Sequence, residues 1–187
     1  MDEILQGFRR AGRVAFRTRE YAALLGKPNY ARLVLHRLKA KGGLILVKRG
    51  WWAFPDALPE AIACDMSQPA YVSFHSALFL RNLTTQMPRI VQLAVARNAK
   101  TYLVGKICVK EYRVGRTQFT GFYRMDGVLV ASSEKAVADC LAHPRACPEI
   151  IIKEAIGSVD AGKVTKMLVS AAAKRRFARL MKDARQG

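Results

Sequence analysis

Acidic side chains are in short supply in this 187-residue chain, where 14 Asp and Glu stand against 32 Lys and Arg and leave a net charge of +18 at pH 7. So large an imbalance adds only self-repulsion unless a polyanionic partner relieves it. Nucleic acid is the first partner that this charge predicts, and an anionic membrane surface is the second. No apolar run approaches the ~20 residues that a membrane-spanning helix requires.

Cysteine is also scarce, and its spacing argues against two kinds of scaffold. The four cysteines, Cys64, Cys108, Cys140 and Cys147, form no Cys-x-x-Cys pair, so neither a zinc site nor a disulfide framework is indicated. Buried thiols are the simplest interpretation. The N-terminus is acidic and lacks a basic stretch followed by an apolar one, which predicts a cytoplasmic protein. We expect no cofactor and no metal, and we find no internal repeat.

The most informative stretch covers residues 29–54 and reads NYARLVLHRLKAKGGLILVKRGWWAF. In a helix, Ala31, Val34, Leu35 and Leu38 fall on one face at i, i+3, i+4, i+7 spacing, which predicts the buried side. The remaining side and its flanks carry polar and basic residues and one leucine, namely Asn29, Arg32, Leu33, His36 and Arg37. The pattern therefore predicts a helix with one face for a core and one for an acidic partner.

A hairpin is predicted directly after this helix. Gly42 and Gly43 favour the end of the helix, and residues 44–47 are too short and too β-branched to continue it. Lys48 and Arg49 then stand with a glycine at a tight turn, and residues 51–54 return as the second strand. Since Trp51 and Trp52 point to opposite faces of a regular strand, we expect one in the core and the other against a sugar or covering the hairpin.

The elements before residue 29 complete a recognised order. We predict a helix over 3–11, an extended piece over 14–16, and a helix over 18–25 that Thr18 caps. The basic helix and the hairpin follow these elements, and the whole is the order of a winged helix-turn-helix. In such a domain the basic helix would lie in the major groove, and Lys48 and Arg49 would bind flanking phosphates. A solvated amphipathic helix beside an ordinary hairpin is the alternative. Charge favours DNA binding, because residues 1–54 hold 12 Lys/Arg and 3 Asp/Glu.

The second part of the chain begins after a proline-rich boundary. Pro55 and Pro59 break both periodicities, so we predict a winged-helix DNA-binding domain over 1–56 and an α+β domain over 59–187. Short β-rich runs over 90–96, 101–109, 118–123 and 128–131 predict a small, mostly antiparallel sheet. Helices are expected over 61–66, 73–83 with Ser73 as cap, 133–141, 148–156, 161–172, and in a last basic segment through Ala184.

Three segments resemble the AbiEi family of antitoxins: PAYVSFHSALFLRNLTTQMPRIVQLAVA over 69–96, VLVASSEKAVADCL over 128–141, and RLKAKGGLILVKRGWWAF in the first domain. The resemblance implies a winged-helix domain that binds inverted repeats in its own promoter. It also implies a C-terminal domain that counteracts a separately encoded nucleotidyltransferase toxin, and no enzymatic activity. Two features depart from the family: the chain is short, and its last helix is unusually basic, with Lys174, Arg175, Arg176, Arg179, Lys182 and Arg185.

Two serine-containing segments invite catalytic interpretations. His75 and Ser76 are adjacent, and neighbours at i and i+1 of a helix do not face each other, so a nucleophile and base pair is not expected. At the junction before residues 133–141, Ser133, Glu134 and Lys135 follow another serine, and a capping serine with an acid in the first turn explains that pattern. A structural role is the first interpretation of these three residues, and contact with a toxin is the second.

The reading that these patterns favour is an α+β DNA-binding autorepressor with antitoxin activity, whose partners are double-stranded promoter DNA and a nucleotidyltransferase toxin. One alternative is a stand-alone winged-helix regulator without a toxin. Another is a metal-dependent nuclease, for which Glu111 and Asp126 are the scattered carboxylate candidates in the sheet region. The oligomeric state stays open, with a dimer on inverted repeats as one arrangement.

Overall fold

The computed structural model describes residues 2–184, and within them it forms a mixed α+β protein with nine α-helices, one 3₁₀ helix and two β-sheets. The α-helices are α1 Glu3–Arg10, α2 Thr18–Leu25, α3 Pro28–Ala40, α4 Pro59–Ser67, α5 Phe74–Leu80, α6 Ser133–Ala142, α7 Glu149–Ile156, α8 Ala161–Met167 and α9 Ala171–Asp183. The strands are β1 Ala15–Arg17, β2 Ile45–Lys48, β3 Trp51–Ala53, β4 Ala70–Val72, β5 Val91–Val95, β6 Thr101–Val104, β7 Ile107–Arg113, β8 Phe122–Met125 and β9 Val128–Ala131, with the 3₁₀ helix η1 at Arg116–Gln118.

The first sheet joins the beginning of the chain to the hairpin. Its strand order is β1-β3-β2, and both pairings are antiparallel, with Ala15 opposite Ala53 and Arg17 opposite Trp51. Helices α1, α2 and α3 share one hydrophobic core with this sheet, in which the Phe8 and Phe16 rings stack at 4.5 Å between centroids. The first unit of the fold is therefore α1 to β3.

Helix α3 confirms the predicted buried face. Ala31 and Leu35 are fully buried, while Val34 and Leu38 are half-buried against the same core. Pro28 occupies the first helical turn, where a missing backbone N–H costs nothing. After the helix, Gly42 adopts a φ of +73°, the left-handed conformation that glycine tolerates best.

The predicted cap of α2 is wrong. Thr18 is already helical, and the N-cap is Arg17, whose backbone N–H donates to the Glu20 carboxylate at 2.5 Å. The Thr18 hydroxyl instead accepts a hydrogen bond from the indole N–H of Trp52 on β3, at 2.8 Å. Glu20, the third residue of α2, thus supplies the N3 half of a capping box, which is a different hydrogen bond from the one expected of the threonine.

Both tryptophans of β3 are core residues, so the expectation that one of them would cover a sugar or the outside of the hairpin is wrong. Trp51 is 9% exposed and Trp52 is 2% exposed. Each tryptophan is buried in a different hydrophobic core, because a second unit packs against the other side of β3. That second core includes Ala15, Trp51 and Ala53 together with the large sheet.

The second sheet has six strands in the order β6-β7-β5-β4-β9-β8 and is mixed. Strand β5 runs parallel to β7 and β4 runs parallel to β9, while the other three pairings are antiparallel. The prediction of a mostly antiparallel sheet missed β4, a three-residue strand at its centre. It also placed β8 too early, because residues 116–118 form η1 and the strand begins at Phe122.

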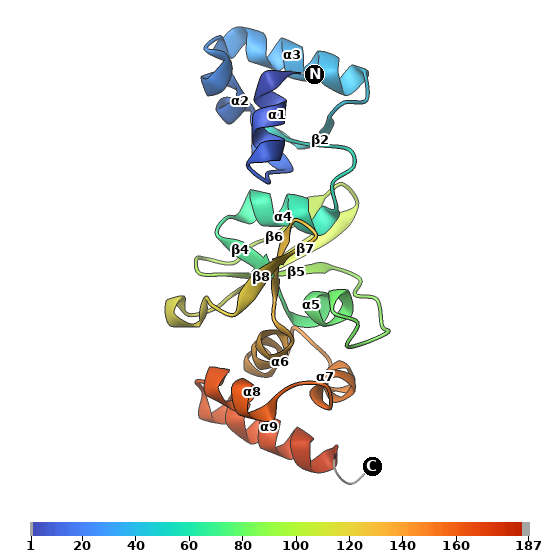
Figure 1. Ribbon diagram of the computed structural model, residues 1–187, viewed down its shortest axis with the longest axis vertical. Coiled ribbons are helices and arrows are strands. Elements are labelled where there is room, and N and C mark those ends of the chain that lie inside the picture. The colour runs from blue at the N-terminus through green and yellow to red at the C-terminus, as the bar shows by residue number, and fades with distance from the viewer. Residues whose placement is uncertain (1, 185–187) are drawn as a thin grey trace.

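Helices cover the large sheet on both faces (Figure 1). Helix α4 lies between the first unit and the sheet, and α5 and α6 lie on the opposite face. Helices α8 and α9 form the end of the molecule farthest from α3, and the segment predicted as one helix over 161–172 is divided between them. Cys64, Cys140 and Cys147 are buried and Cys108 is half-buried, all as free thiols. Arg185 lies outside the described residues.

Helix α4 joins the two units through specific polar contacts. The Asp65 carboxylate accepts hydrogen bonds from the backbone N–H groups of Val14 and Ala15, at 2.7 and 2.9 Å. Nearby, Arg9 of α1 forms a bidentate ion pair with Asp56, at 3.0 and 2.8 Å. The first unit is therefore bound to the second by its own backbone as well as by the shared burial of β3.

Candidate nucleic-acid interface

Helix α3, the start of α2 and the β2–β3 turn enclose two adjoining hollows on the first unit. One has a volume of about 600 Å³ and the other of about 410 Å³, and Thr18, Arg32, Arg49 and Gly50 line both. Arg17 and Arg19 line the larger hollow only. We call this feature the arginine groove, after Arg17, Arg19, Arg32 and Arg49.

The arginine groove carries uncompensated positive charge. Among the described residues, none of its four arginines forms an ion pair with an acidic side chain. Two of the three acids of the first unit are engaged elsewhere: Glu20 pairs with Arg13 at 2.8 Å, and Asp2 caps α1 and accepts from the hydroxyl of Tyr21. A concave surface lined by one sign of charge concentrates the field and attracts polyanions.

Aromatic rings stiffen the floor of the groove. Trp52 is held by Thr18, and the His36 ring meets the Trp52 ring edge to face at 5.2 Å between centroids. The Arg17 guanidinium lies 4.8 Å from the centre of the Trp51 ring, within cation–π range. These contacts fix the base of α3 and the hairpin relative to each other, so the exposed arginines project from a rigid surface.

The predicted site residues fall into three groups. Arg32, His36 and Arg49 line the arginine groove. Asn29, Leu33 and Arg37 are exposed on α3 but outside both hollows. Lys48 lines neither hollow, and its ammonium lies against the ring of Tyr102 in the second sheet.

Sequence reasoning missed Arg17 and Arg19. They belong to the groove because β1 pairs with β3, which brings Arg17 opposite Trp51 next to the hairpin turn. A pattern did exist, since basic residues at 17 and 19 flank the first residue of α2. Its meaning depended on a pairing between segments far apart in the chain.

Two residues at the β9–α6 junction, Ser132 and Lys135, make contacts that hold the fold. Ser132 caps α6 by accepting from the backbone N–H of Lys135 at 3.1 Å, while Ser133 and Glu134 are half-buried. The Lys135 ammonium is buried and pairs with Asp139 at 2.6 Å. Lys135 is therefore enclosed in the fold and does not face solvent.

Asp139 gathers further donors inside the same core. Tyr71 and Ser73 both donate to its second carboxylate oxygen, at 3.0 and 2.7 Å. Ser73 precedes α5 but makes no side-chain cap, which corrects the predicted role. A buried carboxylate with one ammonium and two hydroxyl donors is fully satisfied, and it stabilises the packing of α6 on β4.

The other catalytic candidates do not assemble into a site. His75 donates to the carbonyl of Gln86 at 2.7 Å, and Ser76 donates to the carbonyl of Ile90 at 3.1 Å. Glu111 is buried on β7 against Arg97, whereas Asp126 lies in the β8–β9 turn at the other edge of the sheet. Across residues 2–184, no group of three or more His, Cys, Asp or Glu side chains is arranged to hold a metal ion.

Within residues 2–184 the helices are all too short or too polar to cross a bilayer. The fold and its surface define a mixed α+β protein of two sheets with a strongly basic groove on its first unit. No family model matches the chain, and no curated relative matches it.

The fold is shared with a solved structure. The chain is similar to the crystal structure of the RV2827C protein from Mycobacterium tuberculosis, with a TM-score of 0.61 and 13% sequence identity, over 97% of this chain and 75% of that chain. At this identity the likeness establishes the common arrangement of elements alone. The function therefore has to be argued from the groove.

Proposed function

We propose that the protein binds double-stranded DNA through a winged helix-turn-helix formed by α1 to β3. The observation that carries this proposal is the arginine groove, where four arginines without acidic partners surround the junction of α3 and the hairpin. The order helix, strand, helix, helix, hairpin, with the hairpin paired to β1, matches the architecture of that class. The excess charge of the first 54 residues supports a polyanionic ligand.

Helix α3 is the element that would enter the major groove, which admits a single helix. Its exposed side carries Asn29, Arg32, Leu33, His36 and Arg37, of which Arg32 and His36 line a hollow together with residues of the hairpin. An arginine there can bind the O6 and N7 atoms of guanine with two hydrogen bonds. Arg49, at the hairpin turn, lines the same groove and would bind a phosphate beside that site.

The resemblance to AbiEi antitoxins supports a more specific role for the whole chain. We infer a non-enzymatic transcriptional autorepressor that binds promoter inverted repeats and opposes a nucleotidyltransferase toxin encoded nearby. Co-expression of the chain with the product of the neighbouring reading frame tests the antitoxin part. Co-purification and restored growth support it, whereas DNA binding without either result leaves a stand-alone regulator.

A magnesium-dependent cleavage assay on duplex DNA tests the nuclease alternative.

Salt dependence of binding tests the DNA interface directly. Each phosphate contact that is lost should make the slope of log affinity against log salt shallower by roughly 0.9. Arg49→Ala should show this change on both specific and unrelated duplexes. Lys174→Ala removes the same charge from an exposed position on α9, at the far end of the molecule, and should leave the slope unchanged. Equal slopes for wild type and Arg49→Ala would remove the hairpin from the interface.

A further inference from the structure

The β2–β3 hairpin touches the large sheet at a point outside the arginine groove. The ammonium of Lys48, the last residue of β2, lies 4.8 Å from the centre of the Tyr102 ring on β6. A cation at this distance is attracted by the electron-rich face of the ring. Burial lowers the pKa of Lys48, the nearby Lys100 and Arg17 lower it further, and Glu111 opposes the shift.

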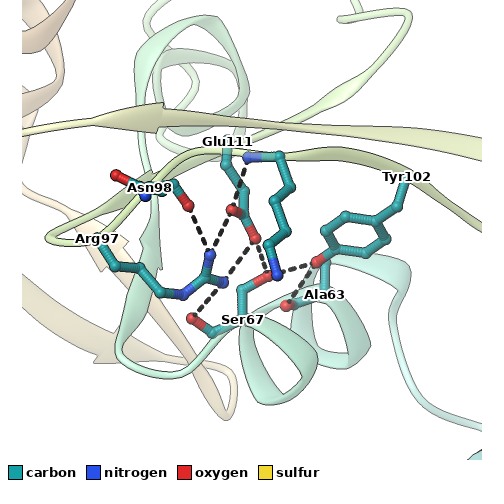
Figure 2. Close-up of polar contacts among 7 residues, drawn as sticks. Ala63, Ser67, Arg97, Asn98, Tyr102 and Glu111 are labelled. Carbon is teal, nitrogen blue, oxygen red and sulfur yellow. Dashed lines mark hydrogen bonds and ion pairs between the residues drawn. The ribbon is translucent and has the colours of Figure 1, made fainter.

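The Tyr102 ring is itself held by α4 (Figure 2). Its hydroxyl donates to the carbonyl of Ala63 at 3.1 Å and is hydrogen-bonded to Ser67. Ser67 in turn donates to the buried carboxylate of Glu111 on β7 at 2.5 Å. Burial raises the pKa of the Tyr102 phenol to about 12, so the ring is neutral at pH 7. Two elements of the second unit thereby fix the ring that Lys48 meets.

Glu111 makes its direct contacts with groups other than Lys48. Its two carboxylate oxygens accept from the Arg97 guanidinium at 2.9 and 2.8 Å, and one of them also accepts from the backbone N–H of Lys100 at 3.0 Å (Figure 2). This carboxylate pairs with Arg97 and forms no ion pair with Lys48, although its charge still favours the protonated form of that lysine. The direct contact that the second unit makes with the Lys48 ammonium is the face of the Tyr102 ring.

Lys48 and Arg49 are neighbours in the hairpin, but their side chains have different surroundings. Arg49 lines both hollows of the arginine groove, whereas Lys48 lines neither and faces the second unit. We propose that Tyr102 is a positioning residue, which holds the β2–β3 hairpin where Arg49 faces DNA, with Lys48 as the anchor and not as a phosphate contact. This inference rests on the proposed DNA binding and assigns the second unit a part in presenting the hairpin.

Hydrogen exchange of the full chain tests the anchor without DNA. Tyr102→Leu removes the ring face, and Tyr102→Phe keeps it. Amides of residues 45–50 should exchange roughly two- to fivefold faster in Tyr102→Leu, the factor that an exposed cation–π contact supplies, and stay close to wild type in Tyr102→Phe. Lys48→Gln should reproduce the faster exchange, and Lys48→Arg should restore protection. Equal exchange in Lys48→Gln and wild type would overturn the anchor, and this surface substitution is not expected to disturb the fold.

Salt titrations with duplex DNA test the division of labour between the two cations. Lys48→Gln should weaken binding about two- to fivefold and keep the wild-type salt slope, whereas Arg49→Gln should make the slope shallower by roughly 0.9. An equally shallow slope in Lys48→Gln would show that Lys48 binds phosphate itself and would refute its assignment as an anchor. If the wild-type chain bound no DNA, the proposed function would fail, while the exchange experiment would still decide whether Tyr102 holds the hairpin.

Discussion

Trp51 and Trp52 are consecutive residues of β3, and their side chains are buried in two different hydrophobic cores. Trp51 packs with the large sheet and α4, while Trp52 packs with α3 and the other helices of the first unit. Because successive side chains of a strand point to opposite faces, one short strand serves as a wall of both cores. The first unit is therefore not independent of the second.

Truncation of the chain after residue 58 should reveal this dependence. In the full chain, Trp51→Ala should cost about 3–5 kcal/mol of unfolding free energy, as expected for a buried tryptophan. In a fragment of residues 1–58 the same substitution should cost much less, because the side chain is already uncovered. Urea unfolding followed by circular dichroism measures both differences. Equal costs in the fragment and the full chain would contradict the shared strand.

Arg32 should determine part of the sequence preference. Replacing it by alanine should relax the preference at one base position per half-site, by ~1–3 kcal/mol if the arginine binds a guanine edge. Leu35→Ala provides the opposite control, since Leu35 is fully buried and its truncation should cost about 2–5 kcal/mol of stability. Binding titrations across single-base operator variants, with thermal melts on the same samples, separate the two effects. If Arg32→Ala kept the full base preference, residues other than Arg32 would determine the sequence specificity.

The buried Lys135–Asp139 pair should be far more sensitive than ion pairs on the surface. Asp139→Asn keeps acceptors for Tyr71 and Ser73 but leaves the ammonium of Lys135 without a counter-charge, and we expect a loss of about 3–5 kcal/mol.

Glu149→Gln is the matched control for this pair, because the Arg179–Glu149 ion pair is exposed and should contribute only about 0–1 kcal/mol. Urea titrations at pH 7 compare the two variants. Similar losses of unfolding free energy in both variants would mean that Lys135 and Asp139 are not both charged in the folded protein.

His143 should make stability fall on mild acidification. Burial lowers the pKa of this imidazole, which meets the rings of Phe74 and Tyr112 edge on; Asp139 opposes the shift, and Lys135 favours it. Since the pKa in the folded state lies below that in the unfolded state, the unfolded chain binds the proton first as pH drops below ~6.5. The contribution is complete above that pH and is lost as pH falls through the folded-state pKa.

Thermal melts between pH 7.5 and pH 5 test this dependence, with His143→Gln as the variant that removes the titrating group. The decline in melting temperature should become shallower in His143→Gln. A wild-type decline in His143→Gln would assign the pH dependence to other groups.

Local patterns predicted the first unit well. The end of α2, the buried face of α3 and the position of the hairpin all follow from periodicity and from glycine placement within short windows. Strand β9 was also predicted at its observed bounds, because Val128 to Ala131 is a β-branched run between a glycine and a capping serine. In each case the residues that determine the element lie next to it in the chain.

The features that were missed depend on distant partners. Strand β4 has only three residues, and it becomes a strand because β5 and β9 offer it hydrogen bonds on both sides. Arg17 joins the candidate site through the pairing of β1 with β3, and Lys48 leaves it through contact with Tyr102. No window around these residues contains the segment that decides their environment, so propensity and spacing could not reveal it.

The central place of β4 affects how the chain matures during translation. Helix α4 is complete at Ser67 and can dock on β1 early, but the sheet face that covers its other side is not finished until β9 ends at Ala131. At about 5–20 residues per second, ribosomes need roughly 3–13 s for that interval. We expect nascent chains arrested between these points to expose the apolar side of α4 and to bind chaperones, and chains arrested well beyond Ala131 to release them.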